Sequence, residues 1–125
     1  MSAVVLLGHG SRAPGASDSM DRVAAALGAR TGASVHVAHM ELAEPSLAQV
    51  LEEIHTRGER EVTVVPYFLH LGIHLREDIP GLVADCLERL PGMSVRMAPH
   101  LGFDEALVDV VERRLEQAFP TEEEG

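Results

Sequence analysis

The chain has 125 residues, 46% of them hydrophobic, and a formal net charge of −10 at pH 7. A chain of this length can bury the core of one domain, so we predict a single domain over residues 1–125, with residues 121–125 as a frayed acidic tail. The ten basic residues, all arginine, stand against 20 Asp and Glu residues, and aromatic residues make up only 3%. These properties argue against nucleic acid and anionic membranes as partners, and the absence of lysine excludes Schiff-base and Walker-lysine chemistry.

The single cysteine, Cys86, excludes an internal disulfide. It lies on one predicted helical face with Leu82, Val83, Leu87 and Leu90, so we expect a packed core thiol. No stretch approaches membrane-spanning length, and the apolar run at the N-terminus lacks the basic start of a signal peptide. We therefore expect a cytoplasmic protein.

Apolar runs and helical periodicity alternate along the chain. The runs predict four strands, at residues 3–7, 35–42, 62–69 and 93–98. The first helix has its apolar positions at a spacing of 3.6 residues and ends at Gly32.

Residues typical of helix starts and helix ends predict where the other three helices lie. The second opens at Pro45-Ser46, where Ser46 and Gln49 predict a capping box, and it ends at Gly58. The third is expected to start at Asp78 and Pro80 and to stop at Pro91-Gly92. The last follows Asp104, and its apolar residues are expected to face inward: Leu107, Val110, Val111, Leu115, Ala118 and Phe119.

This alternation predicts an α/β fold. We expect a single three-layer domain, with a four-stranded, mainly parallel sheet and helices on both faces.

The segment Gly8-His9-Gly10-Ser11-Arg12 directly follows the first predicted strand. Open α/β folds place their ligand crevice at the carboxyl ends of the strands, so His9 is a candidate site residue, although an isolated histidine here is also typical of a turn. The third predicted strand is followed in the same way by His70 and His74, in a segment that Gly72 predicts to be a loop. The first and third strands are neighbours in the usual order of such sheets, so these three histidines can converge.

Three chemistries are consistent with a histidine in this glycine-rich loop. Gly8-x-Gly10-x-x-Ala13 matches the dinucleotide fingerprint formally, but His9 occupies the turn and the chain is short for such an enzyme. A phosphoryl-transfer histidine of the Arg-His-Gly kind would need arginine in place of Gly8. Metal handling is the alternative that uses all the histidines at the edge, because imidazole is the commonest protein ligand for Co, Ni, Fe, Cu and Zn ions.

The remaining polar candidates have structural alternatives. Glu41, near the carboxyl end of the second strand and on the same face as His39, is placed to accept a proton, or is simply solvated. His100 is interpreted as a solvated loop residue beside the site. The other histidines are interpreted as structural or surface residues: His36, His39 and His55.

Three segments together carry a resemblance to a known family. They are Leu-Leu-Gly-His-Gly-Ser-Arg at 6–12, Met-Glu-Leu-Ala-Glu-Pro-Ser-Leu at 40–47, and Val-Pro-Tyr-Phe-Leu-His-Leu-Gly-Ile-His-Leu-Arg-Glu-Asp-Ile-Pro at 65–80. The chain resembles the small class II chelatases, the sirohydrochlorin cobaltochelatases and ferrochelatases of the CbiX/SirB type, over nearly its whole length. It departs from the family at His70 and His100, positions that are often not histidine there, and it lacks the histidine-rich stretch of some relatives.

The resemblance implies ATP-independent insertion of a divalent metal into sirohydrochlorin, on the route to cobalamin or sirohaem. Co²⁺ is the expected metal, Fe²⁺ and Ni²⁺ are alternatives, and no cofactor beyond this metal substrate is expected. His9 and His74 would bind the metal, and both would act in catalysis with Glu41 as a proton acceptor. A non-catalytic metal carrier or tetrapyrrole-binding module is the alternative function.

The substrate carries many carboxylates, so a protein of net charge −10 needs local positive charge to bind it. Arg12 and Arg76 adjoin the two histidine motifs and are the natural candidates. The full set of expected substrate-binding residues is Gly10, Ser11, Arg12, His70 and Arg76.

A homodimer is expected as the working unit. One sheet edge is shallow, whereas a tetrapyrrole needs walls on both faces, and longer class II chelatases resemble two such halves in one chain. Leu71, Ile73 and Leu75 are the expected interface residues.

Overall fold

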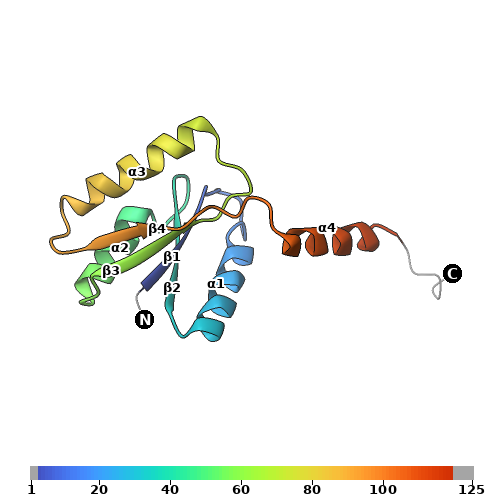
Figure 1. The fold of residues 1–125 in the computed structure, drawn as a ribbon, viewed down its shortest axis with the longest axis horizontal. Helices are drawn as coiled ribbons and strands as arrows, with labels where there is room; N and C mark the ends of the chain where they lie inside the picture. Colours follow the sequence, from blue (N-terminus) through green and yellow to red (C-terminus); the bar gives the residue numbers. More distant parts are fainter. Residues whose placement is uncertain (1–2, 120–125) are drawn as a thin grey trace.

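The computed structural model describes residues 3–119, in which strands and helices alternate (Figure 1). The elements are β1 (Ala3–Gly8), α1 (Asp18–Thr31), β2 (Ser34–His39), α2 (Leu47–Thr56), β3 (Glu61–Pro66), α3 (Ile73–Leu87), β4 (Ser94–Met97) and α4 (Glu105–Gln117). The strands form one sheet in the order β2-β1-β3-β4, and every pair in it is parallel. The predicted α/β fold is thus confirmed, with β1 and β3 as neighbours. The predicted acidic tail, residues 121–125, lies outside the described residues.

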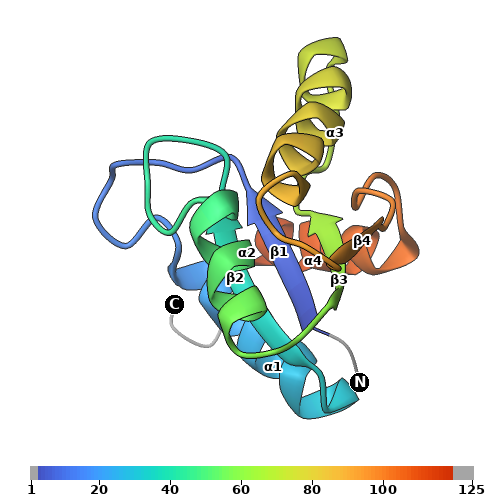
Figure 2. The same ribbon diagram turned by 90° about the vertical axis from the view of Figure 1, so that its left-hand side faces the viewer.

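Helices cover the two faces of the sheet unequally (Figures 1 and 2). The larger apolar core lies between the sheet and helices α2 and α3, where Val5, Leu51 and Val64 are buried. A smaller cluster, built on Leu6 and Met20, lies between the sheet and α1. Because successive strand residues point to opposite faces, β1 is buried on both sides, as expected for a central parallel strand.

Helix α2 begins and ends where its local sequence predicts. The Ser46 hydroxyl accepts a hydrogen bond from the Gln49 backbone N–H at 3.2 Å, and the Ser46 backbone N–H donates to the Gln49 side chain at 2.7 Å. This reciprocal pair is the predicted capping box. Gly32 likewise ends α1 in the left-handed conformation, with φ at 75°.

Three predicted strands are longer than the observed ones; the last, at 93–98, exceeds β4 by one residue at each end. β2 stops at His39, three residues early, because the chain then turns, with Leu42 in the left-handed region at a φ of 65°. β3 stops at Pro66 because Phe68 donates back to the Pro66 carbonyl in a turn.

The predicted start of the third helix is wrong. Helix α3 begins at Ile73, so His74 lies in its first turn and not in a loop. Gly72 is the N-cap residue, and its carbonyl accepts from Arg76. Pro80 therefore lies inside the helix, where it removes one backbone donor but does not mark the start.

The prediction that the last helix faces inward is also wrong. Asp104 caps α4 as expected and accepts from the Ala106 N–H at 2.9 Å. No side chain of α4 is buried, however, and the helix projects away from the sheet (Figure 1). Across residues 3–119, no helix is both long enough and apolar enough to cross a membrane.

Candidate active site at the carboxyl edge of the sheet

Backbone hydrogen bonds tie together the loops that leave the carboxyl ends of the strands. The carbonyl of Gly8 accepts from Met40 at 2.8 Å, and the carbonyl of His9 accepts from Glu41 at 3.1 Å. Across the neighbouring strand, Tyr67 donates to the carbonyl of Leu7 at 2.8 Å. The loops after β1, β2 and β3 are therefore held against one another before any side chain is considered.

His9 and Glu41 form a pair at this edge. The distance from His9 Nε2 to Glu41 Oε1 is 3.5 Å, and the two side chains are 58% and 62% exposed. Glu41 lies on the turn after β2, and not within the strand as predicted, but it still reaches the histidine. The pair thus places an imidazole nitrogen beside a carboxylate oxygen, on side chains that are both open to solvent.

Phe68 is a residue at this edge to which the sequence reasoning assigned no role. Its ring packs edge-on against the His9 imidazole, with centroids 6.4 Å apart and planes at 81°. Its position just after β3, the strand that neighbours β1, is the feature of the sequence that could have indicated it.

Gly10 is required by the backbone at this point. Its φ of 102° is unfavourable for residues with a side chain, and a Cβ atom here would overlap the carbonyl oxygen of Glu41. The glycine lets the loop after β1 pass close enough to the Glu41 backbone to bring His9 and Glu41 together. Its role is thus geometric, in addition to any contact with a ligand.

The other predicted site residues lie on the segments that follow β1 and β3. Ser11 and Arg12 are exposed on the loop after β1, and the Ser11 hydroxyl accepts from the Ala13 N–H at 3.1 Å. His70 is exposed in the loop before α3, and His74 is exposed on the first turn of that helix.

A mostly apolar cavity of about 220 Å³ lies between α3 and the segment after β4. Arg76, His100, Leu71 and Leu75 are among its lining residues. It adjoins the edge on the side of β3 and β4.

A closed metal cage is absent from the part of the chain that the structure describes. Within residues 3–119, no group of three His, Cys, Asp or Glu side chains is placed to hold one ion. A single copy therefore offers His9 with Glu41 and, separately, His74.

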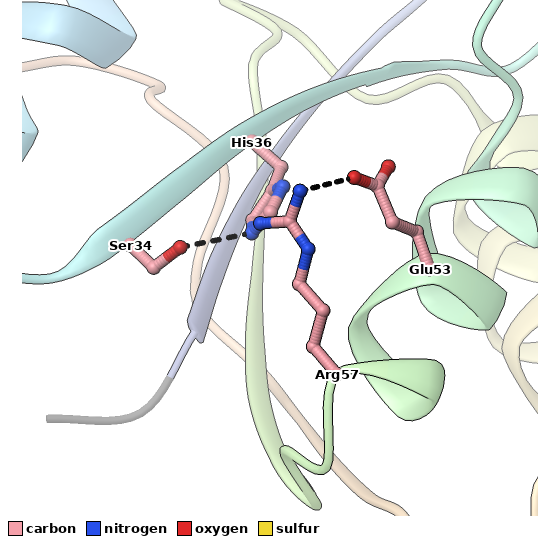
Figure 3. Close-up of polar contacts among 4 residues, drawn as sticks. All are labelled: Ser34, His36, Glu53 and Arg57. Carbon is pink, nitrogen blue, oxygen red and sulfur yellow. Dashed lines mark hydrogen bonds and ion pairs between the residues drawn. The ribbon is translucent and has the colours of Figure 1, made fainter.

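The histidines interpreted as structural or surface residues lie apart from the pair. His36 Nε2 is 3.1 Å from the Ser34 hydroxyl near the start of β2, and Arg57 bonds Glu53 on α2 nearby (Figure 3). His55 Nε2 is 2.9 Å from the carbonyl of Pro91.

His39 is the buried exception among these histidines. Its side chain is 4% exposed, and Nδ1 has no hydrogen-bond partner among residues 3–119. The ring lines a cavity of about 230 Å³ together with Gly10, Ser11 and Met20. It belongs to the packing beneath the loop after β1.

Fold and site together define an open parallel α/β domain with its candidate ligand site at the carboxyl ends of its central strands. Residues 3–118 match the family model CbiX. The chain therefore belongs to the CbiX family, in agreement with the motifs at 6–12, 40–47 and 65–80.

Curated relatives carry the names of two related activities. The chain is 34% identical over 117 residues to "Sirohydrochlorin ferrochelatase, chloroplastic" of Arabidopsis thaliana, covering 93% of this chain and 52% of that protein. It is 28% identical over 124 residues to "Sirohydrochlorin cobaltochelatase" of Methanosarcina acetivorans, covering 93% of this chain and 95% of that protein. The chain thus spans about half the length of the plant relative and nearly all of the archaeal one.

Solved structures share the fold. A CbiX protein from Marinobacter aquaeolei superposes with a TM-score of 0.80 at 31% identity, over 94% of this chain and 98% of that one. The sirohydrochlorin chelatase SirB from Bacillus subtilis, solved in complex with cobalt, gives a TM-score of 0.82 at 28% identity, over 94% of this chain and 51% of that one.

Proposed function

We propose that this protein inserts a divalent metal ion into sirohydrochlorin without ATP. The observation that carries the proposal is the pair of His9 and Glu41, 3.5 Å apart at the carboxyl edge of a CbiX-family sheet. Relatives named sirohydrochlorin ferrochelatase and sirohydrochlorin cobaltochelatase support the choice of tetrapyrrole.

Metal insertion requires an ion that is held but still has open coordination positions. We assign His9 and His74 as its ligands, because two imidazoles bind such an ion and leave positions free for the incoming pyrrole nitrogens. The exposure of both side chains supports this assignment, since the macrocycle has to reach the ion directly. The edge-on contact with Phe68 would restrict the orientation of the His9 ring.

Two pyrrole protons must leave the macrocycle as the metal enters. The Glu41 carboxylate is the proposed acceptor of one, and the imidazole of His9 can take the other once the ion has moved to the macrocycle. The 3.5 Å separation keeps the carboxylate close enough to act on the same metal-bound macrocycle.

Cobalt is the metal that we propose, with iron and nickel as alternatives. Imidazole binds all three ions, and the names of the relatives include both cobalt and iron activities. We expect no cofactor beyond this metal substrate, and we propose the cytoplasm as the location.

Substrate carboxylates are proposed to bind arginines beside the pair. Arg12 and Arg76 are exposed and flank the two histidine motifs, where they would offset the net charge of −10. Gly10, Ser11 and His70 complete the proposed contact surface.

We propose a homodimer as the working unit. His9 and Glu41 are more than half exposed, so one copy provides a single wall for the macrocycle, and a second copy would supply the other. Of the three expected interface residues, Leu71 and Leu75 already pack partly against their own core. Ile73, 74% exposed, stays available for contact with the macrocycle or the partner.

An absorbance assay tests the proposed reaction. Protein, sirohydrochlorin and Co²⁺ should change the spectrum of the macrocycle faster than the spontaneous reaction does, and the initial rate should scale with protein concentration. A metal carrier or tetrapyrrole-binding module would bind the metal or the macrocycle without accelerating this change, and that result would reject the catalytic proposal.

A further inference from the structure

The cavity between α3 and the segment after β4 has no role in the site described so far. Its volume is about 220 Å³, and its walls are mostly apolar, with side chains that include Leu71, Leu75, Ile79 and Met97. Among the described residues that line it, Arg76 and His100 carry the polar side chains. An apolar hollow with a few polar groups is the usual form of a site for a small organic group.

Both walls of this cavity are connected to the proposed metal ligands. In the wall after β4, Leu101 donates to the carbonyl of Phe68 at 3.1 Å, and the Phe68 ring packs against the His9 imidazole. The other wall is α3, which carries His74 on its first turn, directly before the lining residue Leu75. A group held in the cavity would therefore belong to a ligand that also reaches the metal site.

The polar side chains of the cavity suit an anion. Arg76 is exposed and His100 is half-buried, and the ion pairs within residues 3–119 involve other residues. Glu77 and Asp78 follow Arg76 on α3, but neither carboxylate lines the cavity. A guanidinium and an imidazole beside apolar walls are suited to a carboxylate on a short hydrocarbon chain.

The volume of the cavity suits one arm of the macrocycle and not the whole of it. Pockets for complete drug-sized ligands measure roughly 300–1,000 Å³, so a cavity of about 220 Å³ holds only part of a tetrapyrrole. The arms of sirohydrochlorin are acetates and propionates, and a propionate has one methylene more than an acetate. Burying one methylene group favours binding by about fourfold, so the apolar walls favour a propionate.

We propose that this cavity binds a propionate arm of sirohydrochlorin, with Arg76 and His100 as donors to its carboxylate. The inference rests on the proposed function and adds His100 to the proposed substrate-binding residues. A carboxylate has two oxygens, so one oxygen can accept from each side chain. An arm fixed beside His9 and His74 would orient the macrocycle toward the metal ion.

Protection from diethyl pyrocarbonate tests where the macrocycle binds. The reagent modifies accessible imidazoles, and peptide mass mapping gives the rate at each histidine with and without metal-free sirohydrochlorin. We expect protection of His100 together with His9 and His74, and no protection of His36, which lies on β2 away from this edge.

The other outcomes of this experiment separate the inference from the proposed function. Protection of His9 and His74 without His100 would overturn the inference and leave the proposed function standing. Protection of His100 alone would place the macrocycle away from the metal site and would contradict both. If none of the three is protected, both fail as well.

Substitutions at position 100 test whether the imidazole acts as a donor. His100→Leu keeps the wall of the cavity apolar, whereas His100→Gln keeps an N–H donor. Fluorescence titration with metal-free sirohydrochlorin should show roughly 10-fold weaker binding by His100→Leu, because a hydrogen bond to a charged group is lost, and binding by His100→Gln within about threefold of the wild type. His36→Leu is the matched control and should bind as the wild type does. Wild-type affinity in His100→Leu, or an equal loss in both variants, would overturn the inference.

Steady-state kinetics separate binding of the arm from the chemistry at the metal. His100→Leu should raise KM by roughly 10-fold and leave kcat nearly unchanged, because the contact with the propionate is the same before and during metal insertion. A lower kcat at an unchanged KM would contradict a role in binding.

A double variant tests whether the two donors share one carboxylate. Arg76→Gln/His100→Leu should weaken the binding of metal-free sirohydrochlorin by less than the product of the two single effects, because either single change already disrupts the same contact. Effects that multiply would show that the two side chains bind different groups, and would overturn the shared site.

Discussion

The backbone, more than contacts between the side chains themselves, positions the His9–Glu41 pair. The Glu41 N–H donates to the carbonyl of His9, and Gly10 permits the close approach of the two loops. Either side chain can therefore be replaced without removing the hydrogen bonds that hold the edge together. Substitutions of His9 and Glu41 therefore test the chemical roles of the two side chains without removing these backbone contacts.

We expect His9→Ala and His74→Ala each to lower the rate of metal insertion by roughly 100-fold or more, because each removes a proposed metal ligand. Both side chains are exposed, so the unfolding transition should be little changed. His70→Ala should cost less activity. His36→Ala, far from this edge, is the control for loss of an imidazole. Wild-type activity in His9→Ala would reject the assigned site.

Glu41→Gln should slow turnover by roughly 10- to 100-fold while leaving Co²⁺ affinity nearly unchanged, because the amide keeps the shape but does not accept a proton as readily. Turnover is followed by absorbance and metal affinity by calorimetry. If turnover matches the wild type, Glu41 is a solvated turn residue with no part in proton transfer.

The Cys86 thiol should be unreactive in the folded protein. Burial raises its pKa above the ordinary 9.0, although the hydrogen bond from Arg89 acts in the opposite direction. The thiolate is therefore scarcer in the folded state than in the unfolded one. Iodoacetamide at pH 8 should label the native protein at least ~10-fold more slowly than protein in denaturant. Equal labelling rates would contradict this.

The same pKa difference predicts a loss of stability at high pH. A thiol whose pKa is raised by folding contributes stability below its unfolded pKa, and this contribution is lost as the pH rises through the folded value. The free energy of unfolding should therefore fall above pH 9.0, and Cys86→Ala should fall less steeply over the same range.

Among the elements, α2 is the one that its local sequence specifies most completely. Its capping box, its buried face and its end all follow from residues within the helix or next to it. Helix α3 differs, because its N-cap residue Gly72 has no side chain that could cap the helix, and Pro80 misleads any prediction based on helix signals alone.

Ser46→Ala should lower the free energy of unfolding by about 1 kcal/mol, because it removes the side-chain acceptor for the Gln49 N–H at the start of α2. Urea unfolding measures the change. Ser19→Ala, at an exposed position of α1, is the matched control and should change stability by less than ~0.5 kcal/mol. A similar effect of both variants would show that the cap contributes little.

For the whole molecule, the shared cleft predicts that dimerisation and activity go together. Dilution of the wild type below the dissociation constant of the dimer keeps His9, Glu41 and His74 in every chain, yet the monomer should lose most metal insertion, because only one wall of the cleft remains. Absorbance rates and light scattering on the same dilution series measure both properties. A fully active monomer would contradict the shared cleft.

The sequence by itself determined the α/β class, the parallel sheet, the caps of α2 and α4, and the placement of His9 after β1. These features follow from periodicity and capping, which act over a few residues. It also indicated that Glu41 reaches the site, but for the wrong reason, since it placed Glu41 on a strand.

Only the tertiary structure decided the rest. The close approach at Gly10 and the contact of Phe68 with His9 depend on hydrogen bonds and packing between segments far apart in the chain. The outward direction of α4 is the clearest case. The amphipathic pattern of α4 predicts that one face of the helix is covered. The pattern does not indicate which surface covers this face, because the direction of the helix depends on where residues 98–104 are held against the sheet.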